Sequence, residues 1–121
     1  MSFFIKKNVL NSLLLAAKNV YPNEFFALLG GSSNVIDEFV VVPAIFGHDF
    51  SEFDVNSVPF DNKIIGTVHS HPDYVVRPSS QDLIVFSKFG FVHIILGFPY
   101  NFNSFKAFNG NGKIIDLKVI D

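Results

Sequence analysis

The chain has 121 residues, no cysteine, sixteen phenylalanines and a formal net charge of −2. This length suits a single domain over residues 1–121 with one hydrophobic core. The charge gives no basic surface for a nucleic acid, and the absence of cysteine excludes disulfides, thiolate zinc sites and thiol nucleophiles. Any bound metal must therefore use histidine and carboxylate ligands.

An apolar stretch after Lys6 and Lys7 loosely imitates a signal peptide, but Asn11 and Ser12 interrupt it. Its apolar residues recur at the spacing of one helical face, so an amphipathic helix is the simpler interpretation. These residues are Leu10, Leu13, Leu14, Ala17 and Val20. No stretch approaches the roughly 18 apolar residues of a membrane span. We therefore expect a cytoplasmic protein with no membrane partner.

A β-hairpin is predicted after the first helix. Tyr21-Pro22-Asn23 ends the helix because proline cannot continue it, which leaves Glu24 at a junction. Phe25 to Leu29 then has the composition of a buried strand. Residues 30–34 supply a turn before a second strand, Val35 to Val42.

A histidine-bearing strand is predicted in the middle of the chain. Residues 43–62 precede it and indicate a long loop, a class of segment that is usually functional. Lys63 to Val68 is apolar and β-branched, and we expect this strand to deliver His69-Ser70-His71 at its C-terminal end. A second helix then begins near Ser79 and stops at Gly90, a residue suited to helix ends.

The remaining chain predicts three strands, Phe91 to Leu96, Phe105 to Phe108 and Lys113 to Ile120. Asn109-Gly110-Asn111-Gly112 joins the last two as a hairpin. The order of helix, strands, helix and strands indicates an α/β fold of mixed α+β layers. We expect a central mixed β-sheet flanked by two helices, with the strand order left open.

A candidate metal site follows from two histidines and one carboxylate. Because His69 and His71 are two residues apart on a strand, their side chains share a face and can bind one ion. A bare His-X-His is more often a pair of ordinary strand-end histidines. Asp82 changes this balance, since the ten-residue connection lets it fold back beside the strand end. This donor set with an open position is typical of catalytic zinc.

Several of these residues also have structural interpretations. Ser79 and Asp82 have the spacing of a capping box, and this role is compatible with metal binding. Glu24 alone would be a solvated loop carboxylate. His93 lies in an apolar strand, where we expect a core or sheet-face histidine. His48, in the long loop, could contact substrate, although no spacing requires it.

The combined pattern resembles the JAMM, or MPN+, metalloprotease family. Glu24, His69-Ser70-His71, seven residues and Ser79-Ser80-Gln81-Asp82 match its Glu, His-Ser/Thr-His and Ser-X-X-Asp signature without a gap. Flanking residues resemble the family as well, namely Tyr21 to Gly31, Gly66-Thr67-Val68 and Arg77-Pro78. The chain is most similar to the compact archaeal or bacterial form. The resemblance implies the MPN fold, which is cytidine-deaminase-like.

The same resemblance implies a zinc site. His69, His71 and Asp82 would bind Zn²⁺ with a water in the fourth position, where zinc lowers the pKa of water to about 7. Glu24 would act as the general acid/base and Ser79 would stabilise the oxyanion. Ser70 points away from its neighbours, and we expect it to support them.

The resemblance further implies cleavage of a peptide or isopeptide bond after the C-terminal Gly-Gly of a ubiquitin-like modifier or sulfur-carrier protein. We expect that tail to lie along a sheet edge near residues 43–62. Two other classes stay open. One is a zinc hydrolase of small molecules, although the cysteine-containing deaminase signature is absent. The other is a non-catalytic MPN interaction module, although such scaffolds usually lack part of the ligand set. The sequence does not name the modifier or the oligomeric state.

Overall fold

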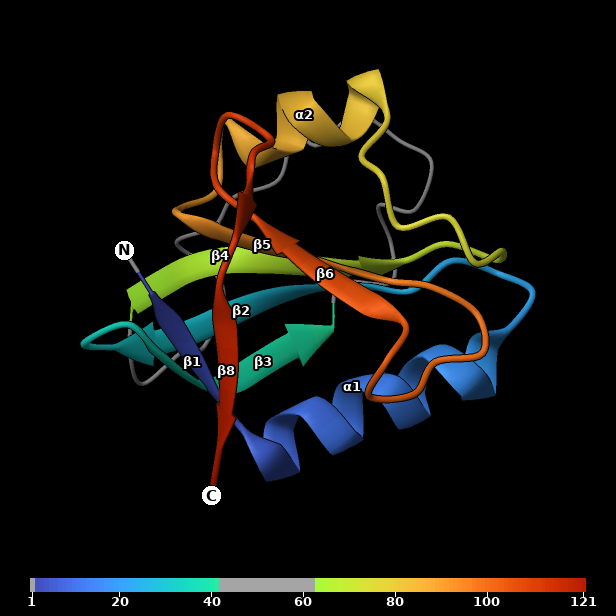
Figure 1. The fold of residues 1–121 in the computed structure, drawn as a ribbon, viewed down its shortest axis with the longest axis horizontal. Helices are drawn as coiled ribbons and strands as arrows, with labels where there is room; N and C mark the ends of the chain where they lie inside the picture. Colours follow the sequence, from blue (N-terminus) through green and yellow to red (C-terminus); the bar gives the residue numbers. More distant parts are fainter. Residues whose placement is uncertain (1, 42–62) are drawn as a thin grey trace.

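The computed structural model describes residues 2–41 and 63–121. Over these residues an eight-stranded mixed sheet has one helix on each face, with α1 below the sheet and α2 above it in Figure 1. The strand order is β7-β6-β5-β4-β2-β3-β1-β8. The predicted mixed sheet with two flanking helices is therefore confirmed.

The elements follow the chain as β1 (Phe3–Lys6), α1 (Lys7–Val20), β2 (Phe26–Ser32), β3 (Val35–Val41), β4 (Lys63–Ser70), α2 (Ser80–Phe86), β5 (Val92–Leu96), β6 (Phe105–Phe108), β7 (Ile114–Ile115) and β8 (Leu117–Ile120).

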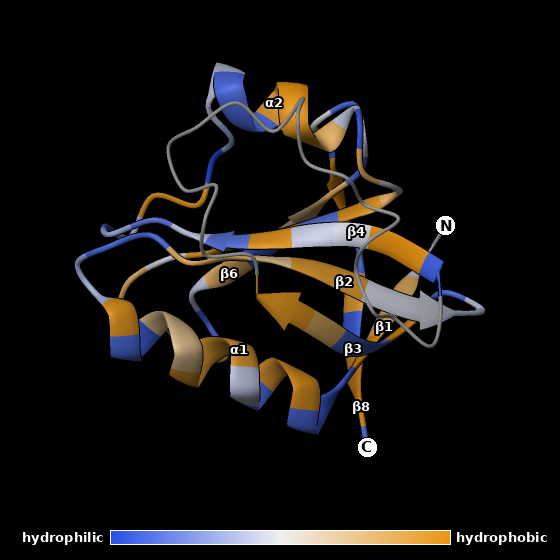
Figure 2. Cartoon of the chain, turned by 180° about the vertical axis from the view of Figure 1, so that it is seen from behind, coloured by the Kyte–Doolittle hydropathy of each residue, from blue (hydrophilic) through white to orange (hydrophobic). Residues whose placement is uncertain are grey.

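Packing against the sheet stabilises α1. The helix has no side-chain cap at Lys6. Its apolar side turns toward the strands in Figure 2, and it buries Val9, Leu10, Leu13, Leu14 and Ala17. Each fully buried leucine contributes roughly 1.5–3 kcal/mol. The amphipathic helix is confirmed, except that Val20 is 37% exposed. Neither helix in the described part of the chain is long and apolar enough to cross a membrane.

The sequence did not predict β1. Phe3 and Ile5 are buried in the core while Lys6 faces outward. Four residues are too few for a clear period of two, and β1 has partners from distant parts of the chain. It pairs in parallel with β3 and β8.

The first hairpin turn is tighter than expected. Gly30 and Gly31 belong to β2, and the turn is Ser33-Asn34, with φ angles of 53° and 66°. Two consecutive residues at positive φ favour a type I′ turn, whose twist matches that of the flanking strands. A side chain at Gly31 would collide with the carbonyl oxygen of Val35. This close approach explains why a glycine lies inside the strand.

One row of side chains crosses four strands on the α2 face. β4 ends at Ser70, so the strand includes His69 as expected, while His71 lies just beyond its end. His69 pairs with Phe26 of β2 and Ile95 of β5, and Ile95 pairs with Lys106 of β6. Cross-strand partners project to the same face. The face that holds the histidines therefore continues to Lys106.

The second helix is shorter than predicted. It ends at Phe86, whereas the sequence indicated an end at Gly90. Gly90 has a φ of 102° and lies in the turn before β5. The prediction that Gly90 ends the helix was therefore wrong, because the positive φ of this glycine serves a turn that follows the helix end.

The predicted strand from Lys113 to Ile120 is two strands with different partners. Ile114–Ile115 pairs antiparallel with β6, whereas Leu117–Ile120 pairs in parallel with β1. Asp116 separates them, and its carbonyl oxygen accepts a hydrogen bond from the Phe3 N–H at 3.2 Å. β7 and β8 are the two ends of the strand order, so the sheet curls until its edges meet.

Candidate metal centre

Three side chains from β4, the following loop and α2 converge. His69, His71 and Asp82 offer ligand atoms that all lie within 4.8 Å of one another. The His69 Nε2 atom is 3.1 Å from His71 Nε2 and 3.2 Å from Asp82 Oδ1. His71 Nε2 is 3.3 Å from Asp82 Oδ2. The three predicted ligands are therefore brought together.

These separations fit zinc. Ligand atoms about 2.0–2.1 Å from a tetrahedral zinc ion lie about 3.3–3.4 Å from one another. The 3.1 Å separation between the two Nε2 atoms is close to this edge length. Each histidine is also near this distance from the carboxylate, but they approach different oxygens, since His69 is 3.2 Å from Asp82 Oδ1 and His71 is 3.3 Å from Oδ2. Two imidazoles and one carboxylate also leave a fourth tetrahedral position open.

The His71 ring is held in an orientation suited to metal binding. Its Nδ1 atom lies 2.8 Å from the carbonyl oxygen of Val75. Because a carbonyl oxygen can only accept, Nδ1 carries a proton and donates it. The lone pair of neutral His71 therefore lies on Nε2, the atom that faces Asp82.

The backbone of His71 is held as well. Its N–H donates to the carbonyl oxygen of Leu96 at 2.8 Å. Its carbonyl oxygen accepts from the hydroxyl of buried Tyr100, also at 2.8 Å. These two bonds fix a residue that lies just beyond the end of β4.

Asp82 is positioned by a capping box at the start of α2. Its N–H donates to Ser79 Oγ at 3.1 Å, and its Oδ2 accepts from the Ser79 N–H at 2.8 Å. The capping box predicted from the sequence is confirmed. The carboxylate that starts the helix is also the one that faces both histidines, so the two roles coexist.

The electrostatics of the cluster keep Asp82 ionised. Burial opposes ionisation, but hydrogen bonds from His69 and His71 outweigh it and hold the pKa of Asp82 well below its usual range. The hydrogen bond to Asp82 is the main cause that raises the pKa of His71. Without a metal, protonation of a histidine beside the ionised Asp82 is therefore favoured. A bound cation would lie between the same groups and compete with that proton.

Glu24 is tied to the histidine strand through its neighbour. The Phe25 N–H donates to Ser70 Oγ at 2.8 Å, and the Ser70 N–H donates to the Phe25 carbonyl at 2.9 Å. Glu24 is exposed, and its negative charge is one of the smaller causes that raise the pKa of His71, after the Asp82 hydrogen bond. The carboxylate therefore acts on the same site as the three ligand candidates.

His93 lies behind the cluster rather than in it. The residue is fully buried, its Nδ1 is 2.8 Å from Thr67 Oγ1, and its ring stacks on Phe86 at 4.4 Å. Burial lowers the pKa of His93 to about 4. The expected core or sheet-face histidine is confirmed, and it is neutral at physiological pH.

Comparison with known proteins identifies the family. Residues 6–108 match the family described as prokaryotic homologues of the JAB domain. A probable metalloprotease of Haloferax volcanii is 34% identical over 128 residues, which cover 97% of this chain and 79% of the relative. The chain belongs to the JAMM/MPN family.

Solved structures agree with this assignment. A JAB1/MPN domain protein from Archaeoglobus fulgidus is 40% identical with a TM-score of 0.82, over 98% of this chain and 100% of its own. A structure described as JAMM, a metalloprotease-like zinc site in the proteasome and signalosome, is 38% identical with a TM-score of 0.80, over 100% of both chains. A protein from Desulfitobacterium hafniense, 19% identical with a TM-score of 0.62, supports the fold alone.

Sequence reasoning missed the supporting groups of this JAMM/MPN site. The Val75 carbonyl and the Tyr100 hydroxyl both hold His71, and the Phe25 backbone holds Ser70. A backbone carbonyl carries no sequence signal, and Tyr100 lies 29 residues from its partner. Residues 43–62, near which we expect the Gly-Gly tail, fall outside the described residues, and so does His48.

Proposed function

We propose that this JAMM/MPN chain is a zinc-dependent metallopeptidase. Its substrate would be a peptide or isopeptide bond after the C-terminal Gly-Gly of a ubiquitin-like modifier or a sulfur-carrier protein. The observation that carries the proposal is the convergence of His69, His71 and Asp82, whose ligand atoms all lie within 4.8 Å of one another. The similarity to a probable metalloprotease and to a JAMM zinc-site structure supports it.

His69, His71 and Asp82 hold the zinc ion in this proposal. When bound, zinc supplies a Lewis acid that lowers the pKa of water to about 7 and polarises a carbonyl group. The Val75 carbonyl holds the proton of the neutral His71 ring on Nδ1, which places the lone pair on Nε2, and the capping box fixes the Asp82 carboxylate. The ligands are therefore arranged before any metal arrives, which reduces the cost of ordering them.

Glu24 is the general acid/base. Its carboxylate accepts a proton from the attacking water as the water oxygen adds to the carbonyl carbon. It then passes that proton to the amine nitrogen when the carbon–nitrogen bond breaks, so a carboxylic acid and an amine leave the site. Its exposure suits this role, because substrate and water must both reach it.

Ser79 stabilises the developing oxyanion. Its oxygen accepts a hydrogen bond from the Asp82 N–H, and this leaves the hydroxyl proton free to donate elsewhere. Donation to an oxyanion is typically worth about a hundredfold or more in rate. Ser79→Ala should therefore lower kcat by about that factor while zinc stays bound.

Fusions of candidate modifiers that end in Gly-Gly, joined to a short peptide or to a lysine side chain, test the proposal. The zinc-loaded chain should cleave directly after Gly-Gly, with the cleavage point read from intact mass. Glu24→Ala should abolish turnover and keep stoichiometric zinc, whereas His71→Ala should lose the metal as well. Near-normal activity in Glu24→Ala would reject the assigned base.

Failure to cleave any Gly-Gly fusion, together with an absence of stoichiometric zinc in the purified protein, would overturn the proposal. Those two results would favour the non-catalytic interaction module. A control fusion that ends in Gly-Ala separates recognition of the tail from general proteolysis.

A further inference from the structure

A second feature lies beside the metal centre on the same face of the sheet. A groove with a volume of about 270 Å³ runs between the loop after His71 and the strands β6 and β7. The residues that line it are Val75, Val76, Arg77, Lys106, Phe108 and Ile114. No residue of the proposed catalytic machinery is among them.

The groove adjoins the metal centre through the backbone and through the sheet. The Val75 carbonyl, at one wall, accepts the hydrogen bond from His71 Nδ1. Lys106 lies in the same cross-strand row as His69, two strands away through Ile95. Neighbouring strands are about 4.8 Å apart, so the two residues are about 10 Å apart along the row. A substrate bound at the metal could reach both places.

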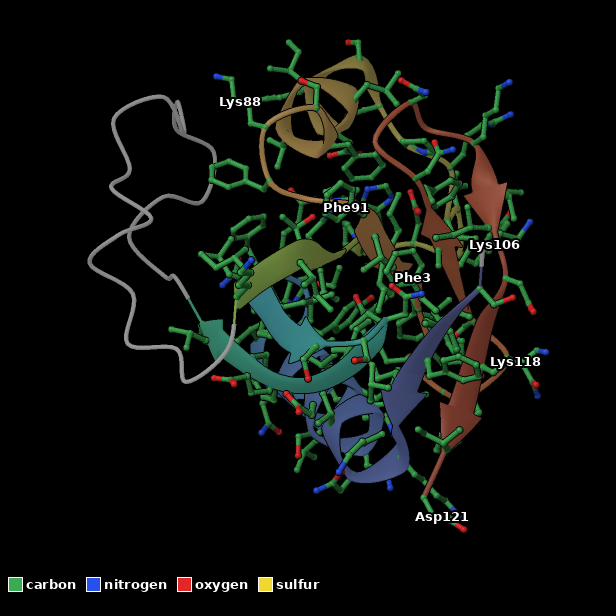
Figure 3. All side chains as sticks on the ribbon, turned by 90° about the vertical axis from the view of Figure 1, so that its left-hand side faces the viewer. Phe3, Lys88, Phe91, Lys106, Lys118 and Asp121 are labelled. Atoms are coloured by element: carbon green, nitrogen blue, oxygen red, sulfur yellow. The ribbon has the colours of Figure 1, made fainter. Side chains whose placement is uncertain are left out.

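The groove is apolar between two cationic side chains. Phe108 is buried at its floor, while Val75 and Ile114 are 38% and 64% exposed. Arg77 and Lys106 are exposed, and Figure 3 shows Lys106 reaching the surface from β6. Within residues 2–41 and 63–121, neither cation forms an ion pair. Exposed apolar groups with unpaired charges beside them are typical of binding surfaces.

We propose that this groove binds a segment of the protein substrate in which an apolar side chain is flanked by carboxylates. The apolar side chain packs against Val76, Phe108 and Ile114, and the carboxylates accept hydrogen bonds from Arg77 and Lys106. Arg binds carboxylates in a bidentate manner that adds geometric selectivity. That the bound segment belongs to a substrate rests on the proposed function. That it is an apolar side chain flanked by carboxylates rests only on the residues that line the groove.

The apolar lining favours a protein segment over a phosphate backbone, which would leave Val75 and Ile114 uncovered. Exposed ion pairs are individually weak, so the charges contribute selectivity and association rate more than affinity. Binding should therefore weaken as salt screens the charges, since the screening length falls from about 14 Å at 50 mM to about 6 Å at 300 mM ionic strength.

Amide chemical-shift titration of the zinc-loaded, ¹⁵N-labelled chain tests the groove. Three pentapeptides serve as probes, each with a central leucine flanked on both sides by Glu, Gln or Lys. The Glu peptide should shift the amides of residues 75–77, 106–108 and 114, with affinity falling at least threefold between 50 and 300 mM NaCl. The Gln peptide should bind more weakly, and the Lys peptide should leave these amides unshifted.

Matched variants localise the effect. Arg77→Gln combined with Lys106→Gln should weaken binding of the Glu peptide at least fivefold. Lys7→Gln combined with Lys18→Gln removes the same charge from α1, on the opposite face of the sheet, and should leave binding unchanged. Equal shifts from the Lys peptide, or equal weakening in the two double variants, would overturn the proposal. Concentration-dependent shifts of the groove amides without peptide would indicate a second copy of the chain and would overturn it too.

Catalysis is separable from this test, because the pentapeptides contain no Gly-Gly bond to cleave. Selective binding without cleavage of any modifier fusion would reject the proposed function and keep the groove. Cleavage with unchanged KM in the Arg77→Gln, Lys106→Gln variant, together with no peptide binding, would reject the groove and keep the function.

Discussion

Ser70 and Phe25 exchange two hydrogen bonds across the sheet, one through the Ser70 side chain and one through its backbone. The Phe25 N–H donates to Ser70 Oγ at 2.8 Å, and the Ser70 N–H donates to the Phe25 carbonyl at 2.9 Å. Ser70 lies between the two histidines, and Phe25 directly follows Glu24. The proposed base and the proposed ligands are therefore tied together through Ser70, which is not itself one of the candidate ligands.

Removal of the Ser70 hydroxyl should impair catalysis without releasing the metal. Ser70→Ala leaves the buried Phe25 N–H without its acceptor, which typically costs about 1–3 kcal/mol. We expect kcat on a Gly-Gly fusion to fall about tenfold or more, with stoichiometric zinc retained. Ser70→Thr keeps a hydroxyl and should restore most of the rate. Loss of zinc in Ser70→Ala, or an unchanged kcat, would contradict this positioning role.

Two substitutions of Asp82 should separate its metal and helix roles. Asp82→Asn keeps an oxygen that can accept from the Ser79 N–H, whereas Asp82→Ala keeps none. Both should lower zinc affinity, by at least the roughly 10–100-fold seen for groups around metal ligands. Asp82→Ala keeps the bond from the residue 82 N–H to Ser79 Oγ but loses the reciprocal bond from the Ser79 N–H, at about 1 kcal/mol.

Zinc affinity of the Asp82 variants can be measured by competition with a chromophoric chelator, and helix stability by urea unfolding in EDTA. Equal stability of the two variants in EDTA would show that the bond from the Ser79 N–H to the side chain of residue 82 contributes nothing to α2. Ser32→Ala, at the exposed end of β2, serves as a control for both measurements.

Loss of the Tyr100 hydroxyl should loosen His71. Tyr100→Phe removes the hydrogen bond to the His71 carbonyl and keeps the buried ring. We expect a loss of about 1 kcal/mol in the free energy of unfolding, with a smaller decrease in zinc affinity than either Asp82 variant. Tyr74 is 81% exposed, so Tyr74→Phe is a matched control and should change neither quantity. Identical behaviour of the two variants would remove Tyr100 from the support of the site.

The buried His93 should make stability fall on acidification. Its pKa is lowered from 6.5 to about 4 by burial. Between these values the unfolded chain binds a proton that the folded chain excludes, so the free energy of unfolding decreases as pH falls from 6.5 to 4. The full effect is roughly 3 kcal/mol, and it levels off below pH 4.

His93→Gln lacks this titration and keeps a side chain that can bond to Thr67. Urea unfolding of both proteins is measured in EDTA from pH 4 to 7. The metal-ligating residues titrate in both proteins, so their contribution cancels when the two unfolding free energies are subtracted. The difference in unfolding free energy between them should change steadily over this range. A constant difference would mean that His93 titrates normally in the folded chain.

Chelation should destabilise the protein, because zinc binds the folded chain through residues from separate elements. A ligand at a free concentration of 100 times its Kd stabilises the folded state by about 2.7 kcal/mol. EDTA should therefore lower the melting temperature of the zinc-loaded chain. His71→Ala should melt at the same temperature with and without EDTA, and a wild-type melting temperature that ignores EDTA would argue against a bound metal.

Local chemistry made much of this site predictable. The period of two places His69 and His71 on one face, and the Ser79 to Asp82 spacing encodes a helix start. Both signals lie within a few residues of the groups they position. Long-range pairing was not predictable in this way. β1 and β8 come from opposite ends of the chain, and nothing within Phe3–Lys6 indicates a partner at Leu117–Ile120.

The same limit applies to the groups around the ligands. Tyr100 reaches His71 from a loop after β5, and Ser70 reaches Phe25 across 45 residues. Each depends on strand order, which the sequence left open. The ligand set of a metal site can thus be predicted from spacing, while the hydrogen bonds that orient it require the tertiary structure.

The split of the last strand at Asp116 also bears on solubility. An open sheet edge presents unpaired N–H and C=O groups that can pair with other chains and start aggregation. Here one continuous segment, Ile114–Ile120, borders β6 at one end of the sheet and β1 at the other. The segment therefore connects the two ends of the strand order and pairs with the strand next to each end. Removal of Leu117–Ile120 would leave one edge of β1 without a partner strand. A deletion far from the metal would therefore expose backbone N–H and C=O groups that can pair with other chains and promote aggregation.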